Sequence, residues 1–206
     1  SDAFFNKYNS LANSNELVLP MTTYRRHISN IGENQPESVV FVTDNSKNLK
    51  RTYTVFRQNP STTGTITQPN FLKGEADAAN KLLRYQYKYM SRNFPESPVE
   101  VTSGNHNVFL ANVLTNSKHS LTERIPAIVG TYETDFMLVQ DFTYSDDEII
   151  NGLNINASGS PLILELKFNG TGVATSVETF TESSLDLVLD SSGNASIVQK
   201  TKMGAE

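Results

Sequence analysis

Residues 136–168 read FMLVQDF, TYSDDE, IINGLNINASGS and PLILELKF, and this stretch decides the fold. Two apolar runs flank a loop rich in Asn, Gly and Ser, which are residues that favour turns. From Leu162 to Phe168, apolar side chains occupy one face, and Ile163, Glu165 and Lys167 occupy the other. Alternation with a period of two is typical of a strand that buries one face. The stretch therefore predicts two strands of an antiparallel sheet.

The composition fits a β-domain with many connections. The 206 residues suffice for one domain or two small ones, and 37% are hydrophobic and 19% charged, both lower than usual. Ser, Thr and Asn make up the difference, and they favour turns and exposed strand positions. Eleven Phe and eight Tyr supply large apolar area, which argues against a disordered chain.

Charge and cysteine content exclude several classes of protein. The net charge of −5 does not favour direct contact with nucleic acid, because such domains are usually basic. The absence of Cys excludes disulfides and thiolate metal sites. No apolar run approaches the ~18 residues of a transmembrane segment, and no signal peptide is visible.

Further strands are predicted on both sides of the opening stretch. Leu17–Met21 contains Pro20, which donates no ladder hydrogen bond and therefore predicts an edge strand or a strand end. In Arg51–Arg57, Thr52, Thr54 and Phe56 share one face of a strand. The remaining strand candidates are Val39–Thr43, Val108–Leu114 (alternatively a helical turn) and a hairpin within Ser183–Lys200. Pro126–Gly130 is a brief apolar run.

The periodicity changes within residues 74–98. Gly74–Leu83 has acidic residues early, Ala in the middle and Lys later, which predicts a short helix. In Arg84–Met90 three tyrosines alternate with other residues, which favours a strand. A helical alternative would align Lys81, Arg84, Lys88 and Arg92 as a basic stripe on a solvated face. Two prolines in Asn93–Pro98 then break the pattern.

About eight strands joined by turns and long loops, with one short helix, predict an all-β chain: an antiparallel eight-stranded jelly-roll sandwich. An immunoglobulin-like sandwich has a similar strand number, but the long connections here fit its regular turn spacing less well. We expect residues 1–16 to form an N-terminal arm or linker, residues 17–200 the jelly-roll domain, and residues 201–206 a C-terminal tail.

No catalytic signature occurs in the sequence. The G-x-S-x-G, Walker and G-x-G-x-x-G patterns are absent. His27, His106 and His119 do not have the spacing of metal ligands, and we expect surface or loop roles for them. We therefore predict no enzyme, no cofactor, and no catalytic, cofactor-binding or metal-binding residues.

An acidic cluster follows the first of the two central strands. It contains Asp141, Asp146, Asp147 and Glu148. Oxygen-rich loops bind Ca²⁺, but the register of an EF-hand is missing, so we interpret the cluster as a solvated turn.

The opening stretch resembles the second jelly roll of double jelly-roll major capsid proteins, the family found in virophages, Polinton-like viruses and their larger relatives. The residues that carry the resemblance are Asp141, Phe142, Gly152, Asn154, Gly159, Leu162, Leu164 and Leu166. Upstream, Tyr85–Tyr87 followed by Phe94, Pro95 and Pro98 is similar to a strand of that family that runs into a Tyr/Phe-Pro-x-x-Pro turn. The hairpin Leu185–Val198 and the early run LVLPM resemble further strands of the family.

The resemblance implies a structural subunit of an icosahedral virus capsid, located in the virion and assembled in the host cell. Its partners would be identical subunits in trimeric, pseudo-hexameric capsomers, neighbouring capsomers, and penton and minor capsid proteins. Residues 1–16 and 59–70 would supply part of the interfaces.

The length of the chain qualifies this resemblance. A double jelly roll needs about twice this length, so the resemblance implies the C-terminal jelly roll, a cleaved product, or a single jelly-roll relative such as a penton protein. The start at Ser1 favours the first two.

Two other functions are compatible with the residues. A non-catalytic β-sandwich binding module, for carbohydrate or a cell surface, would use exposed aromatics such as Tyr85 and Tyr87 as stacking platforms. A hydrolase would use an acidic pair that the sequence does not single out.

Overall fold

The computed structural model describes residues 16–58, 82–100, 137–143, 152–156, 159–168, 174–190 and 194–199. These segments contain nine strands and no helix, and hence no helix that could cross a membrane. The strands are β1 (Glu16–Ile31), β2 (Glu37–Val42), β3 (Leu49–Gln58), β4 (Leu82–Tyr89), β5 (Arg92–Glu100), β6 (Met137–Asp141), β7 (Leu162–Phe168), β8 (Thr175–Asp190) and β9 (Ala195–Gln199).

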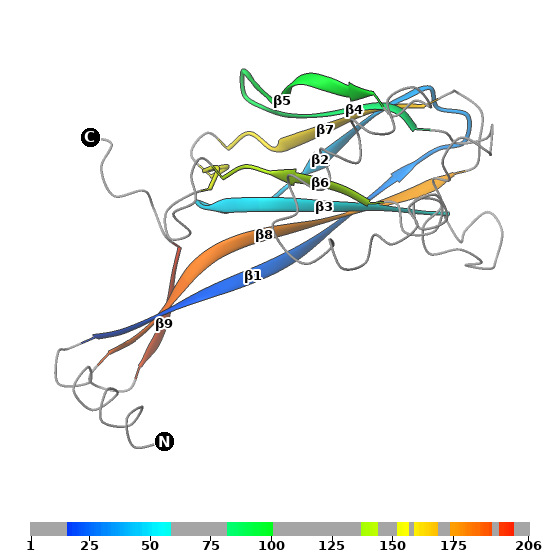
Figure 1. Ribbon diagram of the computed structural model, residues 1–206. Coiled ribbons are helices and arrows are strands. Elements are labelled where there is room, and N and C mark those ends of the chain that lie inside the picture. Colours follow the sequence, from blue (N-terminus) through cyan, green and yellow to red (C-terminus); the bar gives the residue numbers. More distant parts are fainter. Residues whose placement is uncertain are drawn as a thin grey trace, which may run out of the picture.

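The strands form two stacked antiparallel sheets (Figure 1). Sheet A has the order β1-β8-β3-β6, with β9 also paired to β8, and sheet B has the order β2-β7-β4-β5. The first eight strands pair as β1 with β8, β2 with β7, β3 with β6 and β4 with β5. Pairing therefore closes from the two ends of the chain inward, and successive couples alternate between the sheets. This nested order is the jelly-roll topology, so the predicted fold class is confirmed.

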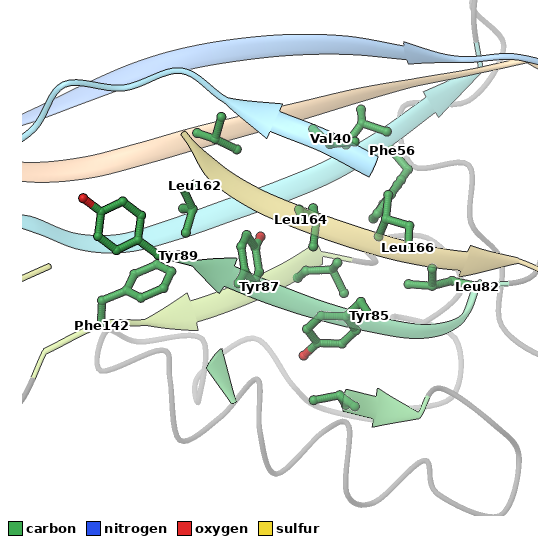
Figure 2. Close-up of a cluster of buried hydrophobic side chains, with 14 of the residues drawn as sticks. Val40, Phe56, Leu82, Tyr85, Tyr87, Tyr89, Phe142, Leu162, Leu164 and Leu166 are labelled. Atoms are coloured by element: carbon green, nitrogen blue, oxygen red, sulfur yellow. The ribbon is translucent and has the colours of Figure 1, made fainter. Parts of the chain in front are cut away.

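The core lies between the inner faces of the two sheets. On β7, Leu162, Leu164, Leu166 and Phe168 are buried and the residues between them are half-buried, as the alternation predicted. Figure 2 shows the side chains of β7 packing among those of neighbouring strands of sheet B, such as Tyr85 and Tyr87 of β4. The residues of the core cluster include Val40, Val42, Leu49, Phe56, Leu82, Tyr89, Leu138 and Phe142.

The glycine-containing segment 152–156 closes one end of the sandwich. Leu153 and Leu49 exchange two backbone hydrogen bonds of 2.8 and 2.9 Å, and the Ile155 amide donates to the Ser46 carbonyl at 3.0 Å. Both Leu153 and Ile155 are buried. A Cβ added at Gly152 would overlap Asn48 and lie 2.6 Å from the Leu49 carbonyl oxygen. A glycine is therefore required for this close approach of two backbones.

Strand β1 is an edge strand, as Pro20 predicted, but it is much longer than Leu17–Met21. All sixteen of its residues pair with residues of β8. The polar residues after Met21 continue the strand because β8 supplies a partner for each of them. The predicted hairpin within Ser183–Lys200 is confirmed as β8 and β9, although β8 begins earlier, at Thr175.

The prediction that Asn93–Pro98 interrupts the strands was wrong, because these residues belong to β5. This strand lies at the edge of sheet B, where proline is tolerated. The pairing of β4 with β5 shifts register between Tyr85 and Tyr87. At that shift the Gln86 side-chain amide donates to the carbonyls of Pro95 and Glu96, at 3.0 and 3.1 Å. The side-chain donor thus satisfies two carbonyl oxygens of β5 at the point where the register shift interrupts the backbone ladder.

Several predicted elements lie wholly or partly outside the described residues. Of the predicted helix Gly74–Leu83, only Leu82 and Leu83 are described, and they begin strand β4. The alternation that favoured a strand over a basic helical stripe in Arg84–Met90 is confirmed, since β4 extends to Tyr89. The predicted runs 108–114 and 126–130, the loop 59–70, the arm 1–15 and the tail 201–206 lie outside the described residues.

Candidate assembly surface

Of the three histidines, only His27 lies in the described residues. It is on β1, opposite Thr179 of β8, and its Nε2 lies 3.5 Å from the Thr181 hydroxyl. Within the described segments, no three His, Asp or Glu side chains are grouped so that they could hold a metal ion.

His27 belongs to a polar cluster that connects β1, β8 and the chain between β2 and β3. Thr181 Oγ1 donates to Asp44 Oδ2 at 2.6 Å, and Arg25 Nη1 lies 2.9 Å from Asp44 Oδ1. Burial lowers the pKa of His27, and the Arg25 charge lowers it further, although the Asp44 charge opposes this shift. The Thr181 proton goes to the carboxylate and not to the imidazole, which is not the geometry of a hydroxyl activated by a histidine base. The cluster therefore ties strands together.

The acidic residue Asp141 is paired with a cation. Arg51 Nε lies 3.2 Å from Asp141 Oδ2, and the Thr143 amide and hydroxyl donate to Asp141 Oδ1 at 2.8 and 2.6 Å. Asp146, Asp147 and Glu148 lie outside the described residues. Asp141 is thus the one residue of the predicted acidic cluster that the structure describes, and its charge is neutralised by Arg51.

Arg51 also links β3 to β8. Its Nη1 lies 3.7 Å from Glu182 Oε1, and the Tyr53 hydroxyl donates to Glu182 Oε2 at 2.6 Å. Burial, followed by the hydrogen bond to Glu182 and the charge of Glu182, raises the pKa of Tyr53 well above its usual range. Arg51, Asp141 and Glu182 therefore form an ion-pair row across β6, β3 and β8 on the face of sheet A opposite the core.

The tyrosines of β4 do not form an exposed stacking platform. Tyr85, Tyr87 and Tyr89 are at most 4% exposed. The Tyr87 hydroxyl lies 2.8 Å from Thr54 Oγ1, and its ring packs edge-on against Phe142 with centroids 5.9 Å apart. The prediction that Tyr85 and Tyr87 bind a ligand by stacking was therefore wrong, because the pleat turns them into the core.

The largest feature that the sequence reasoning missed is a projection of sheet A beyond the sandwich. Strand β8 pairs with β3 from Thr175 to Ser183 and with β9 from Leu185 to Leu189, while β1 follows it along its whole length. The far halves of β1 and β8, together with β9, therefore form a three-stranded extension, which points away from the sandwich in Figure 1. We call residues 16–22, 185–190 and 195–199 the ribbon.

The ribbon is apolar on a face that remains open. The register places Leu19, Leu187 and Ile197 in one row across the three strands, with Met21 and Leu185 in the next row on the same face. Leu19 is 39% exposed, Met21 47% and Ile197 69%, although residues of this kind are usually buried. The opposite face carries exposed Val18 and Val198. The alternation in LDLVLD and LVLPM predicted these strands. It did not show that sheet B leaves their apolar face uncovered.

A second apolar area lies on the outer face of sheet B. In the run VVFV, Val40 and Val42 are buried, whereas Val39 is 51% and Phe41 54% exposed. Beside them is a hollow of about 390 Å³ between β2, β7, β4 and β5. Its charged side chains include two ion pairs, Lys88 with Glu165 at 2.8 Å and Lys167 with Glu37 at 3.6 Å.

No protein-family model matches the sequence, and no curated protein matches it. Among solved structures, the chain is similar to the crystal structure of the mavirus major capsid protein, with a TM-score of 0.49, 12% identity, and coverage of 91% of this chain and 42% of that one. It is also similar to PBCV-1 VP54 fitted into a cryo-EM reconstruction of the virophage Sputnik, with a TM-score of 0.46, 11% identity, and coverage of 92% and 52%.

A third similar structure is that of the Sputnik virophage determined by cryo-EM, with a TM-score of 0.40, 10% identity, and coverage of 92% and 40%. The chain thus spans about half the length of the structures it resembles. Similarities of this size do not define a family for the chain.

Proposed function

We propose that this chain is a structural subunit of an icosahedral virus capsid, a major capsid protein jelly roll that assembles with copies of itself into trimeric capsomers. Three observations support the proposal. The strands have jelly-roll topology. The described polar clusters contain satisfied ion pairs that tie strands together. The motif residues of the opening stretch, such as Gly152 and Leu164, lie at structural positions.

The observation that carries the proposal is the exposed ribbon. Fold alone does not define function, since jelly rolls also occur in lectin and enzyme domains. An apolar extension such as this one is unfavourable on a monomer in water, because each partly exposed large aliphatic side chain forgoes a part of the about 1.5–3 kcal/mol that full burial contributes. Exposed apolar patches of this kind mark protein–protein interaction sites.

The proposal predicts self-association of the purified chain. Sedimentation velocity over a wide concentration range should show a monomer in equilibrium with trimers, and negative-stain electron microscopy at high concentration should show rings or shell fragments. A well-folded chain that remains monomeric at its solubility limit would contradict the proposal. A chain that instead binds glycans reproducibly while monomeric would favour the binding module.

A further inference from the structure

The apolar face of the ribbon carries no charge among its described residues. The register aligns these residues in rows across the three strands, and all of them are apolar: Leu19, Met21, Leu185, Leu187, Leu189, Ala195 and Ile197. Those on the central strand β8 are half-buried, and those on the two outer strands are exposed. Asp186 alternates to the opposite face, in a row with Pro20 and Val198. A segment that covers the apolar face therefore needs an uncharged, apolar surface.

Residues 1–15, the arm, lead directly into this face. They lie outside the described residues, and the chain continues from them into Glu16, the first residue of β1. Glu16 pairs with Asp190, so the junction lies at the outer end of the ribbon. The arm is therefore attached where the uncovered face begins.

The sequence of the arm predicts an amphipathic helix. Five of its six apolar residues fall within about 120° of one another on a helix of 3.6 residues per turn, namely Phe4, Phe5, Tyr8, Leu11 and Ala12. A strand would point the two adjacent phenylalanines to opposite faces, so a helix gathers the five residues and a strand does not. The charged residues of the arm, at positions 2 and 7, lie outside this arc.

A helix over residues 2–12 fits the dimensions of the apolar face. At 1.5 Å per residue it is about 16 Å long, and with its side chains it is about 10–12 Å wide. The face is about 16 Å long from Leu185 to Leu189, and its outer strands lie about 10 Å apart. An isolated helix of this length is marginal in water, so it should form only where its apolar side is covered.

The connection between this helix and the ribbon is short and can reverse the chain. Asn13, Ser14 and Asn15 lie between the predicted helix and β1, and residues of these types favour turns and helix ends. Three residues span at most about 10 Å, which is similar to the distance between two packed layers. The arm can therefore return over the strand that it precedes.

We propose that the arm folds back as an amphipathic helix over the apolar face of the ribbon of its own chain, with Phe4, Tyr8 and Leu11 toward the ribbon. The contact stands on the sequence of the arm and the uncovered face. Its consequence for assembly rests on the proposed function, because the face that the arm covers is the candidate assembly surface. The arm and a neighbouring copy then compete for one face.

The small area of the face favours the tethered arm over a free partner. The face covers roughly 16 by 14 Å, or about 230 Å², whereas a stable interface buries about 800 Å² on each partner. A segment tethered by a short linker has an effective concentration of about a millimolar. Another copy at micromolar concentration therefore displaces the arm only when several contacts form together, as in a closed ring. The arm thus sets a threshold for assembly.

Amide hydrogen exchange tests the contact directly. At a concentration where sedimentation velocity shows only monomer, amides of residues 5–12 should exchange about tenfold or more slowly than those of an unstructured segment, because a docked helix opens rarely. An arm without this protection in the monomer would contradict the contact. Protection that appears only at concentrations where the chain associates would mean that a neighbour's ribbon holds the arm, and the contact within one chain would be wrong.

Two matched pairs of variants identify the contacting sides. Phe4→Asp combined with Leu11→Asp places two charges on the apolar arc, and it should abolish the protection. Asn6→Asp combined with Asn13→Asp is the control, because it adds the same charge at the same spacing of seven residues on the other side of the helix. This control should keep the protection. Equal loss in both variants would contradict the predicted orientation of the helix.

On the ribbon, Ile197→Lys should also abolish the protection of the arm. Val198→Lys is its control, since Val198 is the next residue, is exposed and points to the opposite face, in register with Asp186. Circular dichroism verifies that every variant retains the β-sandwich. Protection that survives Ile197→Lys would show that the arm docks elsewhere.

Association measured by sedimentation velocity tests the competition. An arm that is docked about nine-tenths of the time weakens apparent association about tenfold, so Phe4→Asp with Leu11→Asp should associate about tenfold more tightly than the unmodified chain. Weaker association of this variant would show that the arm is part of the assembly contact and not its competitor. If the unmodified chain and this variant never associate, the proposed function fails, while hydrogen exchange still decides whether the arm covers the ribbon.

Discussion

At residue 152, two segments of backbone lie in direct contact. Gly152 precedes Leu153, which exchanges two hydrogen bonds with Leu49. Asn48 and Leu49 leave no room for a Cβ. The glycine and the two apolar residues that follow it, Leu153 and Ile155, thus close one end of the core between the two sheets. The residues that carry the sequence resemblance in this segment have a structural role.

We predict that Gly152→Ala destabilises the chain by about 1–3 kcal/mol, because the Cβ would displace the backbone at Leu49. Gly32→Ala is the matched control. A Cβ at Gly32 would meet only the Gln35 side chain, at 3.7 Å, so that substitution should be neutral or stabilise by up to about 1 kcal/mol. Urea denaturation of both variants measures the difference. Equal effects would show that the close approach at Gly152 is not tight.

At the scale of elements, ion pairs contribute differently in the two sheets. In sheet A, Arg51 is 8% exposed and lies between Asp141 of β6 and Glu182 of β8. In sheet B, Lys88 and Glu165 join β4 to β7 at 2.8 Å, but their side chains are 35% and 43% exposed. Buried pairs depend strongly on both partners being present, whereas exposed pairs contribute little.

We predict that Arg51→Met lowers the free energy of unfolding by about 3–5 kcal/mol, because it leaves two carboxylates without their cation. Lys88→Met, the matched control in sheet B, should cost at most about 1 kcal/mol. Chemical denaturation at neutral pH compares the two. A cost for Arg51→Met as small as that of the control would mean that water solvates Asp141 and Glu182 in the native state.

At the scale of the whole molecule, the chain divides into a sandwich with a closed core and a ribbon outside it. The described residues Ala195–Val198 of β9 are all exposed, and no residue of β9 belongs to the core cluster. Strand β9 pairs only with β8, beyond the point where β3 ends. Folding of the sandwich and the proposed assembly through the ribbon should therefore be separable.

We predict that a chain ending at Asp190 keeps a cooperative urea transition within about 1 kcal/mol of the full chain, because no core contact is removed. The same truncation should abolish self-association, since it removes Ile197 and uncovers one edge of β8. Sedimentation velocity checks this second expectation. A truncated chain that loses its cooperative transition would show that the ribbon is part of the folding unit.

Local patterns predicted most strands of the jelly roll. Alternation identified the buried face of β7 and of β3, and proline placed β1 at an edge, because pleating and hydrogen-bond capacity are properties of the local chain. Proline also caused the error at β5, where Gln86 supplies donors from a neighbouring strand. The residues of one strand do not show which hydrogen-bond donors the side chains of the neighbouring strand will supply.

The sequence by itself determined the period-two strands and the turns between them, whereas the need for glycine at residue 152 comes from its contact with Asn48 and Leu49. The tertiary structure alone decided which alternating faces are covered. The Leu-rich face of β7 and that of the far half of β8 have the same pattern, yet only the first lies beneath another sheet. Burial depends on where the opposing sheet ends, which is a relation between segments far apart in the chain. For that reason the candidate assembly surface became visible only in the folded structure.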